Sequence, residues 1–344
     1  EYLKIWIDIL TPKQLLFSEP IIERLGGKHE VLCTSREYHE VSKLSKIRHF
    51  DLIFIGKHGG GDKKSKLKAS IERMEKLSKK IKRFEPDLVI SFGSPEAARI
   101  SFGLGIKHIM FCDSPHANAV MKLTLPLIQK LLIPYVIPKK EFAKYGIHEK
   151  NIVQYKAIDA VVTMKRKIRE EPNLPFKNSN KKNILIRVEE EEAAYTSKSS
   201  KIIPIIQKIT KDYKNENIVV LGRYTKQVKD LQKVIGNKVK IVKMSFDGKF
   251  LLNKTDIFIG SGGTMTAESA LMGIPTISYN AVPNIVEEFL VKKNLVKRET
   301  NPNKVSNHIK KIFEIKNNQN QKRAKKIVKE MEDPIEKLIK IIKN

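Results

Sequence analysis

The stretch from Asp256 to Tyr279 reads DIFIGSGGTMTAESALMGIPTISY, and it decides the fold class. It opens with a short apolar run that is typical of a buried strand. The segment TAESALMG then has helical character and closes at Gly273 and Pro275. Three glycines and two hydroxyl residues lie between the two elements. A strand-to-helix turn of this kind is typical of a doubly wound parallel sheet.

The composition of this turn indicates an anion site. Gly262 and Gly263 permit positive φ and a close approach of a ligand to the backbone. Backbone N–H groups and the helix dipole favour a diphosphate, and Ser261 and Thr264 add hydroxyl donors. Glu268, inside the helix, can accept two hydrogen bonds from a ribose diol. The alternative is a plain tight turn with Thr264 as the N-cap. Because the pattern is neither GxGxxG nor a P-loop, it argues against NAD and ATP.

Strand and helix patterns alternate along most of the chain, with a pause near its middle. A polar, proline-containing segment over 165–183 is typical of a linker. We therefore predict an α/β protein with two doubly wound, Rossmann-like parallel-sheet domains and a cleft between them. The predicted strands cover 3–10, 29–35, 51–56, 87–93, 108–113, 183–189, 217–222, 239–244, 255–260 and 275–279, and the helices 17–26, 63–85, 199–214 and 226–235.

These patterns set the predicted boundaries. We expect an N-terminal domain over 1–160, a linker over 161–182 and a C-terminal domain over 183–325. A last helix over 326–344, interrupted by Pro334, is expected to pack back on the N-terminal domain. The apolar segment 119–138 is predicted to be a packed helix, with an interfacial lipid-binding patch as the alternative.

The composition excludes several classes. The 344 residues carry a net charge of +28, but the lysines are spread along the chain and no zinc-finger, RNP or basic-zipper motif occurs. We therefore expect no dedicated nucleic-acid binding. The first residues, EYLKIWIDIL, predict a strand rather than a secretory signal, so we expect a cytoplasmic protein. Cys33 and Cys112 lack CxxC spacing, and we expect neither a disulfide framework, nor a metal, nor a cofactor.

Two loops that follow predicted strands of the first domain carry candidate polar residues. The loop GKHGGG (56–61) is suited to approach an acceptor phosphate, or it is a flexible connection before a basic helix. The loop SFGSPEAAR (91–99) places Glu96 at the strand end as a candidate catalytic residue, unless it only pairs with Arg99. The candidate acceptor- or phosphate-binding residues are His58, Gly59, Gly60 and Ser94.

Two further sets of residues are candidates for catalysis and for binding. In FCDSPHANAV (111–120), Asp113 can orient His116 and raise its basicity, so that the pair could act as a general base. The alternative for His116 is a position near a helix start without chemistry. In the second domain, Arg187 and Arg223 follow strands and could pair with a diphosphate, or they are surface arginines.

SGGTMTAESALMGIP resembles the donor-binding motif of GT-B glycosyltransferases, such as the bacterial peptidoglycan N-acetylglucosaminyltransferase. It also resembles the matching segment of the non-hydrolysing UDP-N-acetylglucosamine 2-epimerases. The resemblance implies that residues 261–264 hold the diphosphate of UDP and that Glu268 binds ribose. Together with IGKHGG (55–60) and SFGSPEAARISFGLGI (91–106), it makes the chain similar to domain-of-unknown-function family 354 of the GT-B superfamily.

The resemblance implies a metal-independent glycosyltransferase that takes a sugar from a nucleotide sugar, with UDP as the expected nucleotide. A lipid-linked or polysaccharide acceptor is expected, and an anionic membrane surface is a further candidate partner because the helix over 63–85 is basic. One alternative is a UDP-N-acetylglucosamine 2-epimerase-like enzyme. Another is a non-catalytic GT-B binding protein, which the loop DILTPKQLL (8–16) favours because Pro12 and Lys13 stand where many GT-B enzymes carry glycines. The sequence leaves the sugar and the oligomeric state open.

Overall fold

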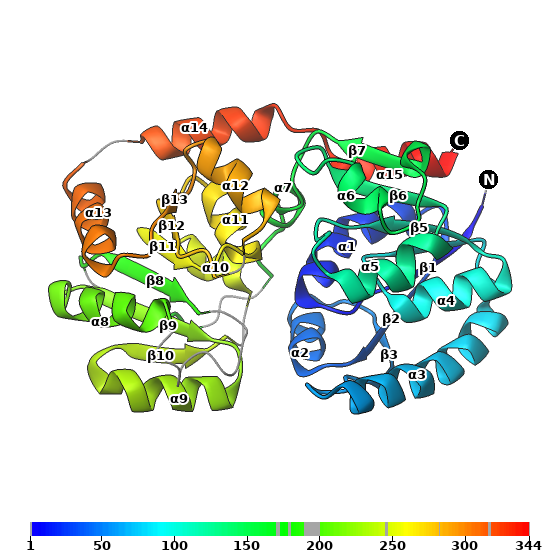
Figure 1. The fold of residues 1–344 in the computed structure, drawn as a ribbon, viewed down its shortest axis with the longest axis horizontal. Helices are drawn as coiled ribbons and strands as arrows, with labels where there is room; N and C mark the ends of the chain where they lie inside the picture. The colour runs from blue at the N-terminus through cyan, green and yellow to red at the C-terminus, as the bar shows by residue number, and fades with distance from the viewer. Residues whose placement is uncertain are drawn as a thin grey trace. The chain divides into compact units, whose positions relative to one another are not determined.

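The chain forms two α/β units, each built on its own parallel sheet (Figure 1). The computed structural model describes residues 2–169, 173–177, 180–188, 200–244, 247–281, 283–315 and 318–343. Unit 1 comprises Glu1–Arg166 and Glu332–Asn344, and unit 2 comprises Lys167–Met331. The prediction of two doubly wound parallel-sheet domains is confirmed by the two sheets.

Unit 1 contains a seven-stranded sheet in the order β3-β2-β1-β4-β5-β6-β7, with every neighbouring pair parallel. The reversal of strand order beside β1 brings the carboxyl ends of β1 and β4 together, which is where such sheets bind ligands. The strands are β1 (Lys4–Asp8), β2 (Glu30–Glu37), β3 (Ile53–Lys57), β4 (Leu88–Ser91), β5 (Lys107–Phe111), β6 (Lys130–Pro134) and β7 (Ile152–Tyr155).

Helices cover both faces of this sheet, and their N-termini are set by local capping. The hydroxyl of Thr11 accepts a hydrogen bond from the N–H of Gln14 at the start of α1, and Ser94 caps α4 through the N–H of Ala97. The helices are α1 (Pro12–Leu25), α2 (His39–Ile47), α3 (Lys63–Phe84), α4 (Pro95–Leu104), α5 (Asn118–Thr124), α6 (Lys140–Ala143), α7 (Ala160–Thr163) and α15 (Pro334–Lys343), with 3-10 turns at Leu125–Leu127 and Glu149–Asn151.

The segment 119–138 is not the single packed helix that we expected. Helix α5 ends at Thr124, a 3-10 turn containing Pro126 follows, and Lys130–Pro134 forms the strand β6. The side chains of Leu131, Leu132 and Ile133 are all buried, because β6 lies inside a sheet that is covered on both faces. A short continuous apolar run gives no periodicity that separates such a strand from a buried helix. The next strand, β7, was not predicted either.

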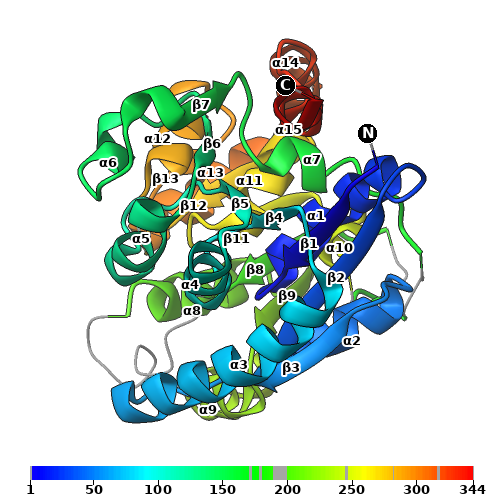
Figure 2. The same ribbon diagram turned by 90° about the vertical axis from the view of Figure 1, so that its right-hand side faces the viewer.

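Helix α3 is buried over only part of its predicted apolar face. Leu77 and Ile81 are buried against β1 and β4, whereas Leu67 and Ile71, nearer the N-terminal end, are 63% and 54% exposed. One turn before Leu77, the core-facing position is Arg73, which is also buried. Figure 2 shows α3 running along the outside of unit 1 beside β3.

The last helix, α15, packs within unit 1. Arg24 at the end of α1 pairs with Asp333 and Glu336 at 2.6 and 3.1 Å. The side chains of Ile335 and Leu338 are buried. The interruption predicted at Pro334 divides the segment 326–344, because α14 ends at Lys329 and α15 begins at Pro334. Among the described residues, no helix is both long and apolar enough to cross a membrane.

Unit 2 contains a six-stranded parallel sheet in the order β10-β9-β8-β11-β12-β13. One apolar cluster packs α8, α9 and α13 on one face, and a second cluster with Phe176 and α10 covers the other. Phe176 lies in the predicted linker, and Pro172 of the same segment is outside the described residues. The strands are β8 (Asn183–Arg187), β9 (Asn217–Gly222), β10 (Lys240–Lys243), β11 (Ile257–Gly260), β12 (Thr276–Ser278) and β13 (Lys297–Arg298), the last not predicted. The helices are α8 (Ile202–Asp212), α9 (Thr225–Ile235), α10 (Gly248–Leu252), α11 (Thr264–Leu271), α12 (Ile285–Lys292), α13 (Pro302–Glu314) and α14, which begins at Gln319, with a 3-10 turn at Gly236–Lys238.

Candidate functional site

The glycine turn of unit 2 joins β11 to α11, as predicted. The N-cap of α11 is Gly263, which has no side chain to donate or accept, so the alternative with Thr264 as N-cap is wrong. A Cβ atom at Gly260 would lie 2.4 Å from Oγ1 of Thr266, so this position has room only for glycine. The N–H groups at the start of α11 are therefore left without a side-chain cap, as an anion site requires.

Two side chains hold this turn in place. Gly262 has a φ of +99°, and its N–H donates to Oγ1 of Thr266 at 3.2 Å. Its carbonyl oxygen accepts a hydrogen bond from Nδ2 of Asn284 at 3.0 Å. Asn284 also caps α12 by accepting from the N–H of Glu287 at 2.8 Å. The turn is thus tied to the helix behind it as well as to its own helix.

The other predicted residues of unit 2 lie at the same edge of the sheet. Arg187 ends β8 and Arg223 follows β9, and β9, β8 and β11 are consecutive neighbours in the sheet. The guanidinium of Arg187 donates to the carbonyl oxygen of Gly222 at 3.4 Å, beside Arg223. Glu268 in α11 is 4% exposed, whereas Ser261 is half-buried and Thr264 is exposed.

At the carboxyl edge of unit 1, a lysine bridges two carboxylates. The ammonium of Lys13, at the start of α1, pairs with Asp113 after β5 and with Asp159 after β7, the latter at 3.0 Å. The hydroxyl of Tyr155 donates to Asp159, and Oγ of Ser114 donates to Asp113 at 2.8 Å. Lys13 takes the place that a metal ion often has between carboxylates. Across the described ranges, no three His, Cys, Asp or Glu side chains are grouped to hold a metal.

The two carboxylates differ in proton affinity. Burial alone would raise the pKa of Asp113, but Lys13 and Ser114 hold it below its usual value. Burial and the charge of Asp113 outweigh the effect of Lys13 at Asp159, so the pKa of Asp159 is raised. Burial also raises the pKa of Tyr155, which keeps its hydroxyl a donor. A low-pKa carboxylate beside a high-pKa one is the arrangement that separates a general base from a general acid.

The structure changes the predicted pairing of Asp113. His116 is exposed, and its charge lowers the pKa of Asp113, so the two are electrostatic neighbours. Within the described part of the chain, however, no hydrogen bond joins them, and Lys13 and Ser114 take the carboxylate oxygens instead. The sequence did not point to Asp159 or Tyr155, because the strand β7 before them went unrecognised.

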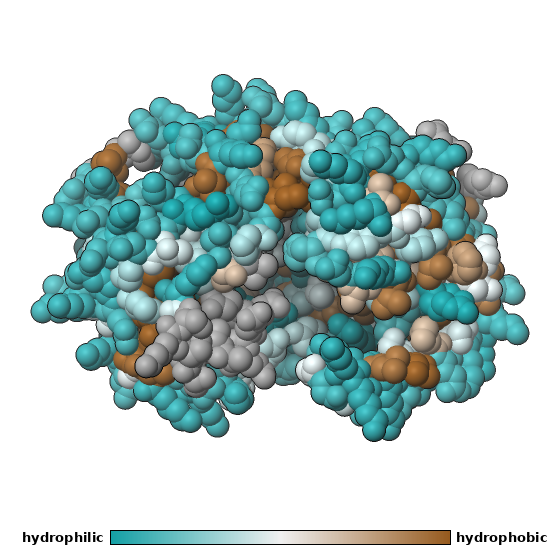
Figure 3. All heavy atoms as spheres, in the orientation of Figure 1, coloured by the Kyte–Doolittle hydropathy of each residue, from teal (hydrophilic) through white to brown (hydrophobic). Residues whose placement is uncertain are grey.

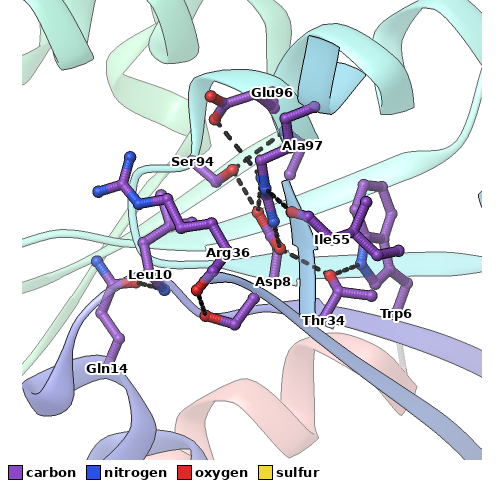
Figure 4. A network of polar contacts seen from close by, with 12 residues as sticks. Trp6, Asp8, Leu10, Gln14, Thr34, Arg36, Ile55, Ser94, Glu96 and Ala97 are labelled. Carbon is purple, nitrogen blue, oxygen red and sulfur yellow. Dashed lines mark hydrogen bonds and ion pairs between the residues drawn. The ribbon is translucent and has the colours of Figure 1, made fainter. Parts of the chain in front are cut away.

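A second polar cluster lies beside it, at the ends of β1, β2 and β4 (Figure 4). Asp8 ends β1 and is fully buried. Its carboxylate accepts from both terminal nitrogens of Arg73 at 3.1 and 2.6 Å, from Ser94 at 2.5 Å and from Thr34 at 2.7 Å. Thr34 in turn accepts from the indole N–H of Trp6 at 2.8 Å. Despite burial, Arg73 holds the pKa of Asp8 below its usual value.

Glu96 joins this cluster from the first turn of α4 and is 6% exposed. Its Oε1 accepts from Oγ of Ser70 at 2.9 Å, and its Oε2 lies 3.6 Å from Nη1 of Arg73. The alternative ion pair with Arg99 does not form among the described residues, and Arg99 is exposed. Gly56, with a φ of +77°, lets the Arg73 side chain pass close to the backbone of β3. A Cβ atom at Gly56 would lie only 2.8 Å from the Arg73 side chain.

The loop after β3 folds on itself. Nδ1 of His58 accepts from the N–H of Gly60 at 3.1 Å, and a Cβ at Gly59 would clash with the backbone of α3. The carboxylate of Asp62 caps α3 by accepting from two backbone N–H groups, each at 3.0 Å. Asp62 thus fills the position at the helix start that a phosphate would take.

Comparisons with known proteins identify the family. The sequence model of a protein family described as "Protein of unknown function (DUF354)" matches residues 3–344. This chain belongs to the DUF354 family. An uncharacterised protein of Methanocaldococcus jannaschii is 29% identical to this DUF354 chain over 320 residues, which are 89% of this chain and 91% of the relative.

Solved structures share the fold of this DUF354 protein. A UDP-GlcNAc 2-epimerase of Neisseria meningitidis, solved bound to UDP-GlcNAc, has a TM-score of 0.76 at 16% identity, covering 99% of this chain and 100% of the epimerase. A glycosyltransferase of Streptomyces sp. SF2575 has a TM-score of 0.61 at 13% identity, covering 99% and 100%. At these identities the likeness shows the fold, which is that of GT-B glycosyltransferases and UDP-GlcNAc 2-epimerases, as the sequence motifs predicted.

Proposed function

We propose that this protein is an enzyme that acts on a UDP-sugar. The observation that carries the proposal is the Lys13-bridged pair of Asp113 and Asp159, whose pKa values lie on opposite sides of the usual range. Paired acid and base groups of this kind serve proton transfer rather than stability alone. The choice of UDP rests on the glycine turn of unit 2 and on the UDP-GlcNAc bound to the epimerase of similar fold.

In this proposal, unit 2 binds the nucleotide. The backbone N–H groups at the start of α11, with Ser261, Gly262, Gly263 and Thr264, hold the diphosphate. The guanidinium groups of Arg187 and Arg223 balance its charge, and the carboxylate of Glu268 binds the ribose hydroxyls. The proposed nucleotide-binding residues are therefore Ser261, Gly262, Gly263, Thr264, Glu268, Arg187 and Arg223.

Two reactions fit a UDP-sugar, and the acid–base pair favours epimerisation at C2. Inversion of that carbon needs one group to remove its proton while the freed electron pair expels UDP from C1. A second group then returns a proton to C2 on the opposite face as UDP adds back to C1. The lowered pKa of Asp113 keeps this carboxylate ionised and able to accept a proton, and the raised pKa of Asp159 suits an acid. The positive charge of Lys13 stays fixed beside both, because the two carboxylates raise its pKa above its usual value despite burial.

Glycosyl transfer is the second candidate, and the position of His116 favours it. Transfer needs a base that takes the proton of an acceptor hydroxyl as the sugar leaves the diphosphate. His116 is exposed and lies within the electrostatic reach of Asp113, so an acceptor from solution can approach it. In either reaction we propose that no metal is required, and retained turnover in EDTA would test this.

One incubation separates the two reactions. UDP-GlcNAc is incubated with the protein in D₂O without an acceptor, and the sugar is followed by proton NMR. Epimerisation places deuterium at C2 and produces the 2-epimer, and both should be lost in Asp113→Asn and Asp159→Asn. Release of UDP only after adding a polysaccharide acceptor, without exchange at C2, would favour transfer. If neither UDP nor any UDP-sugar raises the melting temperature, the proposal fails.

We further propose that unit 1 contacts an anionic membrane surface. Leu67 and Ile71 are exposed on α3, whose N-terminal half carries Lys63, Lys64, Lys66 and Lys68. In Figure 3 an apolar patch lies at the surface where Figure 1 draws α3, with hydrophilic side chains around it. Apolar side chains ringed by lysines suit an interface that is apolar inside and negative at its surface.

A further inference from the structure

Two buried polar atoms beside the Asp8–Arg73 pair have no hydrogen-bond partner in the described chain. They are Oε2 of Glu96, an acceptor, and Nε of Arg36, a donor. Native proteins rarely leave such an atom buried without a hydrogen bond, because the lost contact with water is then not replaced. In Figure 4 Glu96 lies above Ser94, and the Arg36 side chain lies to the left of it.

The charges of this cluster balance. Asp8 and Glu96 supply two negative charges, and Arg36 and Arg73 supply two positive ones. Glu96 is the largest charge acting on Arg36, and it opposes the lowering of the Arg36 pKa by burial. A further anion or cation would leave an uncompensated charge beside side chains that are largely out of water, which is unfavourable. The ligand that fits here is uncharged.

We infer that Glu96 and Arg36 bind a hydroxyl group of an uncharged sugar ring, which donates to Oε2 of Glu96 and accepts from Nε of Arg36. A hydroxyl is the small neutral group that does both at once. Glu96 follows β4 and Arg36 is the second-last residue of β2, so both lie at the carboxyl edge of the sheet where such folds bind ligands. The inference rests on the proposed function for the choice of a sugar, but the contact itself needs no nucleotide.

The chain carries its own reporter of this site. Trp6 is the one tryptophan of the chain. The indole N–H of Trp6 donates a hydrogen bond to Thr34, whose hydroxyl donates one to Asp8. A ligand on Glu96 and Arg36 changes the field on the Asp8–Arg73 pair, and the change reaches the indole through two hydrogen bonds. A spectrum of the ¹⁵N-labelled full-length chain has a single tryptophan indole N–H signal, so this response is read without assignment.

The test compares a neutral probe with a charged one. The labelled protein is titrated with N-acetylglucosamine and, separately, with inorganic phosphate. We expect the sugar to move the indole signal in a saturable way and phosphate to leave it unchanged. A saturable shift with phosphate alone would overturn the inference. No shift with either probe would also overturn it, and the two orphan atoms would then be bridged by water.

Variants decide whether the named atoms make the contact. We expect Glu96→Gln and Arg36→Lys each to raise the Kd for N-acetylglucosamine at least tenfold, because each removes one partner of the hydroxyl. Arg99→Lys, on the exposed side of α4, is the control and should leave the Kd unchanged. Wild-type affinity in both site variants would overturn the inference. Should Glu96→Gln fail to fold, the half-buried Arg36 provides the test alone.

A separate titration with UDP keeps the two proposals apart. UDP binding, measured by calorimetry, should be equal in the wild type, Glu96→Gln and Arg36→Lys. If the wild type binds no UDP but its indole signal responds to the sugar, the proposed function fails and the sugar contact stands. If UDP binds and the sugar moves nothing, the reverse holds.

Discussion

At the scale of single residues, buried charges mark the carboxyl edge of unit 1. Asp8 and Arg73 are 0% and 1% exposed, and they are 65 residues apart in the chain. Breaking a buried pair by removing one charge is far more costly than breaking an exposed one, because the remaining charge stays out of water. The pair is therefore both a support for the site and a weak point of the fold.

The first prediction concerns this pair. Asp8→Asn keeps the side-chain shape but leaves buried Arg73 with only its longer contact to Glu96, so we expect a loss of about 3–5 kcal/mol in the free energy of unfolding. Urea denaturation followed by circular dichroism measures it. The control is Glu72→Gln on the same helix, which removes an exposed pair with Lys68 and should cost less than about 1 kcal/mol. Equal effects of the two variants would contradict the prediction.

The second prediction concerns His108, which is fully buried and bonded to Ser91 and Ser101 at 2.7 and 2.9 Å. Burial lowers its pKa from 6.5 to about 3, with Asp8 opposing. At a pH between these two pKa values, the imidazole of His108 binds a proton in the unfolded chain but not in the folded one. The free energy of unfolding therefore falls as the pH falls below 6.5. We expect a loss of about 2 kcal/mol from pH 7 to pH 5.

The measurement is the urea midpoint at pH 7 and pH 5 for the wild type and for His108→Gln. The variant has no imidazole, so its stability should fall less over this interval by that amount. A wild type and a variant with the same pH dependence would show that His108 takes up a proton in the folded state.

Residues were predictable where one short segment carries the pattern. The turn around Gly262 could be read from the sequence because its glycines and hydroxyls are neighbours in the chain. The pairing of Lys13 with Asp113 and Asp159 could not, because a parallel sheet brings together strand ends that are a hundred or more residues apart. Lys13 had been noted only as a departure from a glycine-rich loop.

At the scale of elements, helix α3 changes character along its length. Its C-terminal half packs apolar side chains on the sheet, whereas its N-terminal half presents Arg73 to the site and Leu67 and Ile71 to solvent. The spacing of apolar residues predicted the helix, but it could not show where the sheet beneath it ends. The strand β6 was missed for a related reason, because burial on both faces removes the alternation that marks a strand.

The third prediction tests the exposed part of α3. We expect the wild type to sediment with vesicles that contain anionic lipid, and more strongly at low salt. Leu67→Ser with Ile71→Ser should reduce the bound fraction several-fold. Val234→Ser, which removes an exposed apolar side chain from unit 2, should not change it. Equal binding of both variants would contradict a role for α3.

The fourth prediction concerns the contact between α12 and the glycine turn. Asn284→Asp keeps an oxygen to cap α12 but loses the donor to the carbonyl of Gly262. The turn then loses one of its two side-chain supports, and the new negative charge opposes a diphosphate. We expect the Kd for UDP to rise at least tenfold by calorimetry. Asn301→Asp, at the cap of α13, is the matched control and should bind UDP as the wild type does.

At the scale of the whole molecule, the two-sheet plan was predictable because each strand run and each linker signal is local. It was harder to derive from the sequence that α15 belongs to unit 1. The ion pairs that attach this helix join residues more than 300 positions apart in the chain. Unit 1 is therefore made of two chain segments, and unit 2 is inserted between them.

The fifth prediction tests this attachment. Ending the chain after Met331 removes the buried side chains of Ile335 and Leu338 and the partners of Arg24. We expect a loss of about 3–6 kcal/mol in the stability of unit 1, since each buried side chain contributes about 1.5–3 kcal/mol. Urea denaturation followed by the fluorescence of Trp6 measures it. Arg24→Ala, which removes only the exposed ion pairs, should cost less than about 1 kcal/mol.

The same arrangement has a consequence for synthesis on the ribosome. Residues 1–166 emerge first, but the helix that completes their unit is translated only after all of unit 2. At about 5–20 residues per second, the nascent unit 1 waits roughly 10–35 s with the surface that receives Ile335 and Leu338 uncovered. During that interval the chain presents an apolar surface to chaperones, and unit 1 can finish folding only once residues 332–344 have left the ribosome.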